Sequence, residues 1–125
     1  MQRIFERLTA DIKQKNSVVC IGLDPAKESV NEIFEFNKRI IDATADIAVA
    51  FKPQIAYYEQ HGEAGIVAFK KTIEYIHAKG VLAIDDCKRG DIGSTSAAYA
   101  KAHFEEFGAD FVTLNPYLGS DSIKP

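Results

Sequence analysis

The sequence predicts an α/β protein whose 125 residues form about the first four β/α units of a (β/α)8 barrel. Short apolar runs of strand length alternate with longer segments whose apolar residues recur every three or four positions. Each apolar run also ends in polar or charged residues, as barrel strands do around an active site. Because a closed barrel takes roughly 250 residues, residues 1–125 are expected to supply the N-terminal half of a single barrel domain.

Four helices are expected where apolar residues return at helical spacing, which gives each helix one face to pack on a sheet. The third and fourth should end at Gly80 and Gly108, since glycine favours the left-handed conformation that ends a helix. Ser94 or Thr95 is expected to cap the start of the fourth through a side-chain oxygen. The expected helices cover residues 2–14, 29–47, 63–79 and 94–107.

Four strands separate these helices, and each βαβ unit should be right-handed with parallel strands. The first strand, at residues 17–23, is almost continuously apolar, which is typical of a strand covered on both faces. Residues 48–51 and 109–114 form the second and fourth expected strands. The third begins at Val81 and continues from apolar residues into a charged segment.

Polar side chains follow every expected strand at its carboxyl end. They are Asp24, Lys52, Asp86 with Lys88, and Asn115. Because parallel strands that follow one another end on the same side of a sheet, these side chains should gather at one edge. Barrel enzymes build their active sites from residues on several strand ends, so this edge is the expected site.

The third strand carries the most informative motif. Residues two apart share a strand face, so Asp86 and Lys88 should point the same way as the core residue Leu82. A carboxylate and an ammonium beside an apolar interior must pair, because burying either one alone is costly. Charged segments after strands are more often solvated loops. Because Asp86 and Lys88 share the strand face of the core residue Leu82, a functional site is favoured instead.

Asp91 offers a second carboxylate three residues after Lys88. Gly90 and Gly93 are expected to let the backbone turn sharply there, since glycine adopts conformations that are closed to other residues. Asp91 would then approach the Lys88 ammonium from another side. An Asp-Lys-Asp cluster of this kind at a strand end is expected to be a functional site rather than part of the scaffold.

The composition excludes several classes of function. A net charge of −3 offers no broad basic surface, so we do not expect nucleic acid as a partner. No apolar run approaches the roughly 18 residues that span a membrane, and the N-terminus lacks an apolar signal core, so a cytoplasmic location is expected. Cys20 and Cys87 are expected to be reduced, packed residues. The histidines lack ligand spacing and should be surface or helix-packing residues; they are His61, His77 and His103.

With these residues in view, the chain resembles the orotidine 5′-phosphate decarboxylase family, in its longer bacterial-type subfamily. The matching segments are Gly22-Leu23-Asp24-Pro25, Phe51-Lys52-Pro53-Gln54, Asp86-x-Lys88-x-x-Asp91-Ile92-Gly93-x-Thr95 and Asn115-Pro116-Tyr117-Leu118-Gly119. The resemblance implies the first half of a TIM (β/α)8 barrel and the decarboxylation of orotidine 5′-phosphate to UMP in pyrimidine biosynthesis. It also implies a carboxy-lyase that uses no metal and no organic cofactor.

The resemblance implies a role for each residue at the strand ends. Lys88 would be the general acid that protonates carbon 6 of the pyrimidine as carbon dioxide leaves. Asp86 would lie beside the substrate carboxylate and hold Lys88. Lys52 would pair with Asp86 and reach the ribose, where Asp24 would accept a hydrogen bond from a hydroxyl group.

By the same resemblance, Asp91 and Thr95 would cross the interface of a homodimer and complete the active site of the neighbouring subunit. The phosphate-binding residues and the mobile lid of the family come from later strand loops, which are not among these 125 residues. We therefore expect the parent enzyme to be active and the 125-residue chain alone to be inactive.

Two alternatives remain open. A related magnesium-dependent decarboxylase of keto-sugar phosphates would use the carboxylates as metal ligands. A second ammonium group at Lys52 is unfavourable beside a divalent cation, which argues against this alternative. The chain would otherwise be a half-barrel assembly module without catalysis, because half of a barrel exposes two unpaired parallel edges.

Overall fold

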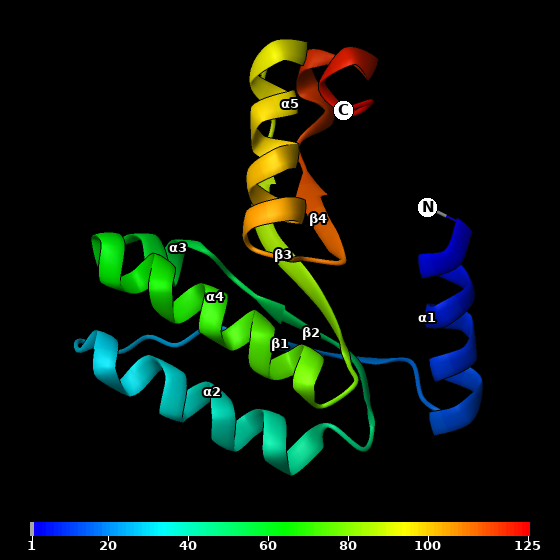
Figure 1. Ribbon diagram of the computed structural model, residues 1–125, viewed down its shortest axis with the longest axis vertical. Coiled ribbons are helices and arrows are strands. Elements are labelled where there is room, and N and C mark those ends of the chain that lie inside the picture. The colour runs from blue at the N-terminus through cyan, green and yellow to red at the C-terminus, as the bar shows by residue number, and fades with distance from the viewer. Residues whose placement is uncertain (1) are drawn as a thin grey trace.

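The computed structural model describes residues 2–125, which form one parallel sheet with helices between successive strands (Figure 1). The strands are β1 (Val19–Leu23), β2 (Ala48–Pro53), β3 (Leu82–Arg89) and β4 (Phe111–Leu114). Their order in the sheet is β1-β2-β3-β4, so strands that follow one another in the sequence are neighbours. This is the α/β arrangement that the sequence predicts.

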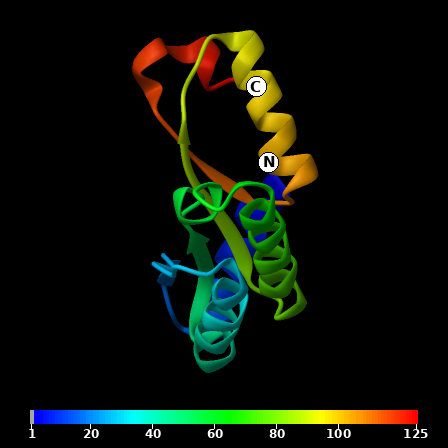
Figure 2. The same cartoon turned by 90° about the vertical axis from the view of Figure 1, so that its left-hand side faces the viewer.

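The helices flank this sheet. They are α1 (Gln2–Lys15), α2 (Val30–Thr44), α3 (Ala56–Glu59), α4 (Gly62–Ala78), α5 (Gly93–Ala100) and the π-helix η1 (Lys101–Glu106), with short 3-10 turns η2 (Pro116–Leu118) and η3 (Ser120–Ser122). Helices α2 and α4 lie side by side against the sheet, and α5 runs directly into η1 beside β4 (Figure 2). No helix of the described residues is long and apolar enough to cross a membrane.

The core lies between the helices and the sheet. Phe51 of β2, Tyr58 of α3 and Phe69 of α4 are fully buried. The Phe69 ring packs edge-on against Tyr58 and Phe107, with ring centroids 5.0 and 5.6 Å apart. Edge-on aromatic pairs add about 0.5–1.5 kcal/mol to the stabilisation from burial. The expected apolar stripe of the third predicted helix therefore faces the core, where Ile73 is buried beside Phe69.

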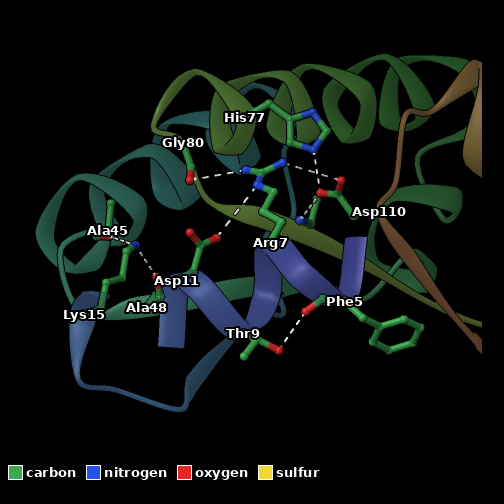
Figure 3. A network of polar contacts seen from close by, with 11 residues as sticks. Phe5, Arg7, Thr9, Asp11, Lys15, Ala45, Ala48, His77, Gly80 and Asp110 are labelled. Carbon is green, nitrogen blue, oxygen red and sulfur yellow. Dashed lines mark hydrogen bonds and ion pairs between the residues drawn. The ribbon is translucent and has the colours of Figure 1, made fainter. Parts of the chain in front are cut away.

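Helix α1 lies at the amino-terminal ends of the strands (Figure 3). The Lys15 ammonium donates a hydrogen bond to the Ala48 carbonyl oxygen at 2.6 Å, where β2 begins. The Arg7 guanidinium donates to the Gly80 carbonyl oxygen at 3.3 Å and lies 3.9 Å from the Asp110 carboxylate, just before β3 and β4. These contacts hold α1 at the end of the sheet where the strands begin, opposite the strand ends that carry the expected site.

Three expectations about the first half of the chain are wrong. β1 is not covered on both faces, since Val19 is 41% exposed, and Cys20 is exposed rather than packed. Helix α2 ends at Thr44, so Ile47 lies beyond the helix and is 48% exposed. Helix α3 was not expected, since four residues are too few to show a periodic pattern.

The fourth predicted helix begins differently from the expectation. Neither Ser94 nor Thr95 caps α5. The helix begins at Gly93, and Ile92 at its N-cap position makes no side-chain hydrogen bond to it. Ser96 instead donates a hydrogen bond from its hydroxyl group to a carbonyl oxygen of the preceding loop at 2.9 Å, which ties the helix to that loop. Gly80 and Gly108 have φ of 72° and 77°, which confirms both glycine helix ends.

Candidate active site

Three charged side chains meet at the carboxyl ends of β2 and β3, as the sequence predicts. Lys52 Nζ donates a hydrogen bond to Asp86 Oδ2 at 2.8 Å, and Lys88 Nζ donates one to Asp86 Oδ1 at 2.5 Å. Asp86 is 7% exposed, whereas the Lys88 side chain is exposed. One buried carboxylate therefore separates two ammonium groups and pairs with both.

Two residues outside the predicted site complete the hydrogen bonding of Asp86. Gln54 Nε2 donates to Oδ2 at 3.1 Å and Thr113 Oγ1 donates to Oδ1 at 2.9 Å, so each carboxylate oxygen accepts two hydrogen bonds. Gln54 follows Lys52 by two residues and Thr113 precedes Asn115 by two. Because residues two apart share a strand face, alternation from Lys52 and Asn115 could have predicted both residues.

The backbone departs from regular strand geometry at Lys88. The pairing of β3 with β4 shifts register in the second half of β3, which marks a bulge. Lys88 has φ of 47°, a left-handed conformation that costs a non-glycine residue about 1–2 kcal/mol. The chain does turn as expected around Gly90 and Gly93, since β3 ends at Arg89 and α5 begins at Gly93, but neither glycine has a left-handed φ. Gly90 instead allows a close approach, because a Cβ atom there would lie 2.6 Å from the Asn115 carbonyl oxygen.

The remaining predicted site residues lie outside this hydrogen-bonded network. Asp24 is exposed just after β1, and Thr95 is half-buried in the first turn of α5. The Asp91 carboxylate accepts a hydrogen bond from the Ile92 backbone amide at 2.7 Å. Across residues 2–125 no ion pair joins Asp91 to Lys88, so the approach expected within one chain does not occur.

Hydrogen bonding sets the charge of the Asp86 carboxylate. Burial alone would raise its pKa, but hydrogen bonds from the two ammonium groups and from the Thr113 hydroxyl group outweigh burial and lower the pKa to about 2. The hydrogen bond to Asp86 also raises the pKa of Lys52, and the charge of Asp24 adds to that effect. At neutral pH Asp86 is therefore an anion and Lys52 a cation.

Asp86→Asn is expected to lower the free energy of unfolding of the chain at neutral pH and to make that free energy less dependent on pH. The folded pKa of about 2 lies below the unfolded value of about 3.9. The carboxylate thus contributes fully above about pH 4 and loses its contribution as the pH falls toward about 2. This difference corresponds to about 2–3 kcal/mol.

Urea unfolding of the wild type and the Asp86→Asn variant, from about pH 7 down to about pH 3, measures this effect. Asp46→Asn, at an exposed position before β2, is the matched control and should leave the pH dependence unchanged. A stability difference between the wild type and Asp86→Asn that stays constant over this pH range would contradict the expectation.

A second polar cluster lies on the opposite face of β3. The nearly fully buried His103 of η1 bonds through Nδ1 to the Asp85 carboxylate at 2.5 Å, while Arg89 Nε donates to its Nε2 at 3.2 Å. Arg89 also pairs with Glu59 of α3. Because Nε2 accepts a hydrogen bond, Nδ1 carries the proton, and His103 is a neutral residue that packs a helix on the sheet, as expected.

Asp85, Cys87 and His103 each place one ligand atom within 4.8 Å of the others, a spacing that a metal ion can bridge. The Arg89 guanidinium opposes this, because it occupies His103 Nε2 and its charge repels a cation. Cys87 is buried and free, as expected, and burial raises the pKa of its thiol. The cluster therefore holds η1 against β3 rather than forming a metal centre.

Comparison with known proteins agrees with this geometry. The family model described as "Orotidine 5'-phosphate decarboxylase / HUMPS family" matches residues 17–125. The chain belongs to this family. It is 50% identical over 135 residues to the orotidine 5′-phosphate decarboxylase of Clostridium acetobutylicum and 48% identical over 136 residues to that of Clostridium perfringens (strain 13). These alignments cover 98% of this chain but 47% and 46% of the relatives, so the chain spans about half the length of the curated relatives it matches.

Solved structures of the orotidine 5′-phosphate decarboxylase family have the same fold. The Leishmania donovani OMP decarboxylase superposes on 98% of this chain with a TM-score of 0.91 at 37% identity, using 48% of its own length. The Leishmania donovani UMP synthase superposes equally well on 97% of this chain, using 26% of its own length. The predicted fold, about half of a TIM barrel of this family, is confirmed.

Proposed function

We propose that residues 1–125 form the N-terminal half of a single (β/α)8-barrel domain that decarboxylates orotidine 5′-phosphate to UMP. The observation that carries this proposal is the Lys52–Asp86–Lys88 array, in which one buried carboxylate holds two ammonium groups at the strand ends. Its position on the fold of this family supports the proposal. The other half of the barrel would supply the phosphate-binding residues and the lid.

The array suits a reaction that generates a carbanion. Loss of carbon dioxide from carbon 6 leaves a localised negative charge without a neighbouring electron sink, so the barrier is very high. Lys88 protonates this carbon, and general acid catalysis contributes about 10²–10⁴-fold. Enzymes lower barriers by about 8–23 kcal/mol, so the fixed positive charges of Lys52 and Lys88 must supply much of the remainder. Asp86 holds and orients both ammonium groups by hydrogen bonds.

The proposal assigns the other predicted residues to the substrate and to a second subunit. Asp24 accepts a hydrogen bond from a ribose hydroxyl group, and Lys52 reaches the same ribose. Asp91 and Thr95 complete the active site of the partner in a homodimer. Both lie outside the charged array of their own chain, which supports a role for them in another subunit. A cytoplasmic location also belongs to this proposal.

Magnesium-dependent decarboxylation of a keto-sugar phosphate is the second candidate, because the description of the matching family covers more than one group. In such an enzyme Asp86 would be a metal ligand. Here the two Asp86 oxygens accept hydrogen bonds from Lys52 and Lys88 at 2.8 and 2.5 Å. Two ammonium groups at these distances oppose the binding of a divalent cation, which favours the metal-free reaction.

Assays of a completed barrel, in which the C-terminal half is supplied by a relative, distinguish the two reactions. Residues 1–125 would be fused to the C-terminal segment of the Clostridium acetobutylicum relative, of which this chain matches 47%. We expect spectrophotometric assays to show equal turnover of orotidine 5′-phosphate with and without a chelator. The intact relative serves as the positive control. Activity that requires magnesium and a keto-sugar phosphate, with no turnover of orotidine 5′-phosphate, would overturn the proposal.

Mixing Asp91→Ala and Lys88→Ala versions of the completed barrel is expected to restore part of the activity that each variant lacks. If Asp91 serves the neighbouring subunit, each hybrid dimer contains one site in which both residues are intact. Steady-state assays of the mixture, with hybrid dimers verified by mass spectrometry, measure the recovery. Each variant alone is the control, and verified hybrids without any recovery would rule out the shared site.

A further inference from the structure

We propose that Thr113 is a positioning residue for Lys88, which it holds by the backbone amide and, through Asp86, by the ammonium group. Thr113 lies on β4, the neighbour of β3 in the sheet, and none of the sequence motifs includes it. The geometry of the network carries this inference. Its consequence for catalysis rests on the proposed decarboxylase function.

One hydroxyl group makes both contacts. Thr113 Oγ1 accepts a hydrogen bond from the Lys88 backbone amide at 2.9 Å and donates one to Asp86 Oδ1 at 2.9 Å. The same Oδ1 accepts the Lys88 ammonium at 2.5 Å. The contacts form a closed ring in which one hydroxyl group and one carboxylate oxygen hold both ends of Lys88. A hydroxyl group can donate and accept through a single atom, which a methyl group cannot do.

The ring lies where the backbone needs support. In the β3–β4 ladder, Asp85 pairs with Val112 and Arg89 with Leu114, and the register shifts between them. Within this bulge the Lys88 amide donates a hydrogen bond to the Thr113 hydroxyl group. A non-glycine residue with φ of 47° persists only where its surroundings enforce that conformation. Thr113 therefore sets the direction in which the Lys88 side chain leaves β3.

Substitutions at Thr113 distinguish the effect of its hydroxyl group from the effect of its shape. Valine has nearly the same shape but neither donates nor accepts, so Asp86 Oδ1 would keep only the Lys88 ammonium, and the Lys88 amide would lose its partner. Serine keeps the hydroxyl group and loses one methyl group. Thr9→Val removes a hydroxyl group that bonds to the Phe5 carbonyl oxygen on α1, far from the site, and is the matched control.

Nuclear magnetic resonance of the 125-residue chain provides readouts that do not depend on activity. In Thr113→Val we expect the titration midpoint of the Asp86 carboxyl carbon to rise by about 1 pH unit. We also expect hydrogen exchange at the Lys88 amide to become at least about tenfold faster. Thr113→Ser and Thr9→Val should retain the wild-type midpoint and exchange rate. Thr113→Ala, which removes the hydroxyl group without adding bulk, should reproduce the effects of valine.

Two results would overturn the inference. One is a folded Thr113→Val or Thr113→Ala variant with an unchanged Asp86 midpoint and unchanged Lys88 exchange. The other is a Thr113→Ser variant as perturbed as Thr113→Val, because the methyl group rather than the hydroxyl group would then act. In the completed barrel, Thr113→Val should lower kcat about tenfold with little change in KM. A wild-type barrel without turnover of orotidine 5′-phosphate would refute the proposed function, whereas the resonance measurements would still decide the role of Thr113.

Discussion

Lys88→Ala in the completed barrel is expected to remove nearly all turnover of orotidine 5′-phosphate, lowering kcat by at least about 10²-fold, while UMP binding remains measurable. Lys88 is the proposed general acid, and general acids contribute about 10²–10⁴-fold to rates. In the proposed reaction its charge also faces the developing carbanion, so the substitution would remove electrostatic stabilisation as well. Asp86 keeps its hydrogen bonds from Lys52, Gln54 and Thr113, so the fold should persist.

Steady-state kinetics together with calorimetric binding of UMP measure the effect of Lys88→Ala. Lys13→Ala is the matched control, because Lys13 is an exposed lysine on α1, at the opposite edge of the sheet. This control should leave both kcat and UMP binding unchanged. A Lys88→Ala enzyme that keeps a tenth or more of the wild-type kcat would show that Lys88 is not the general acid.

Simple alternation along strands was sufficient to predict the charged array. Asp86 and Lys88 are two residues apart, so a strand brings them to the same face, and their opposite charges require them to pair. Parallel strands then bring Lys52, at the end of β2, to the same edge as Asp86. The observed distances of 2.8 and 2.5 Å confirm both steps.

The conformation of Lys88 could not be predicted in the same way. Turn signals in a sequence point to glycine, and Gly90 and Gly93 are nearby, but the left-handed φ belongs to Lys88. The cause is not local: β3 pairs with β4 through a bulge, and a hydroxyl group from β4 holds the amide at that point. Alternation from Asn115 could place Thr113 at the site, but Thr113 is 25 residues away from Lys88, so the motif does not show that it holds the Lys88 backbone.

The errors at helix and strand boundaries also have physical causes. Periodicity continues through Ile47 although α2 ends at Thr44, because an apolar residue after a helix can keep its spacing by chance. The widened turn of η1 leaves no signal in apolar spacing, yet it carries His103 to Asp85. β1 has the apolar composition of a covered strand, and that composition fits a closed barrel better than the open sheet of this chain.

The 125-residue chain alone is expected to self-associate and to lack decarboxylase activity. β1 and β4 are the edges of an open parallel sheet, and each presents unpaired backbone groups to any strand that can pair with them. Apolar side chains on or beside these edge strands are exposed as well: Val19 and Leu114 by 41% each and Tyr117 by 90%. In a closed barrel other strands would cover both edges.

The energies favour association of two or more copies. Leaving even a few hundred Å² of apolar surface in water costs several kcal/mol at about 25 cal/mol per Å². That amount rivals the total stability of a domain, about 5–15 kcal/mol, so contact between edges of two copies should recover much of what one copy lacks. Catalysis would not return with this contact. A second copy duplicates the Lys52–Asp86–Lys88 array and adds no phosphate-binding loops, whose binding energy the reaction needs at the reacting carbon.

Sedimentation of the purified chain at several concentrations tests the first part of this expectation, and assays with orotidine 5′-phosphate test the second. A stable monomer at micromolar concentration would show that the open edges need no partner. Turnover by protein proven free of the host enzyme would show that the phosphate-binding half is dispensable. Association into a discrete species, together with an inactive completed barrel, would instead favour a half-barrel assembly module, because the exposed edges and not the charged array would then account for the behaviour of the chain.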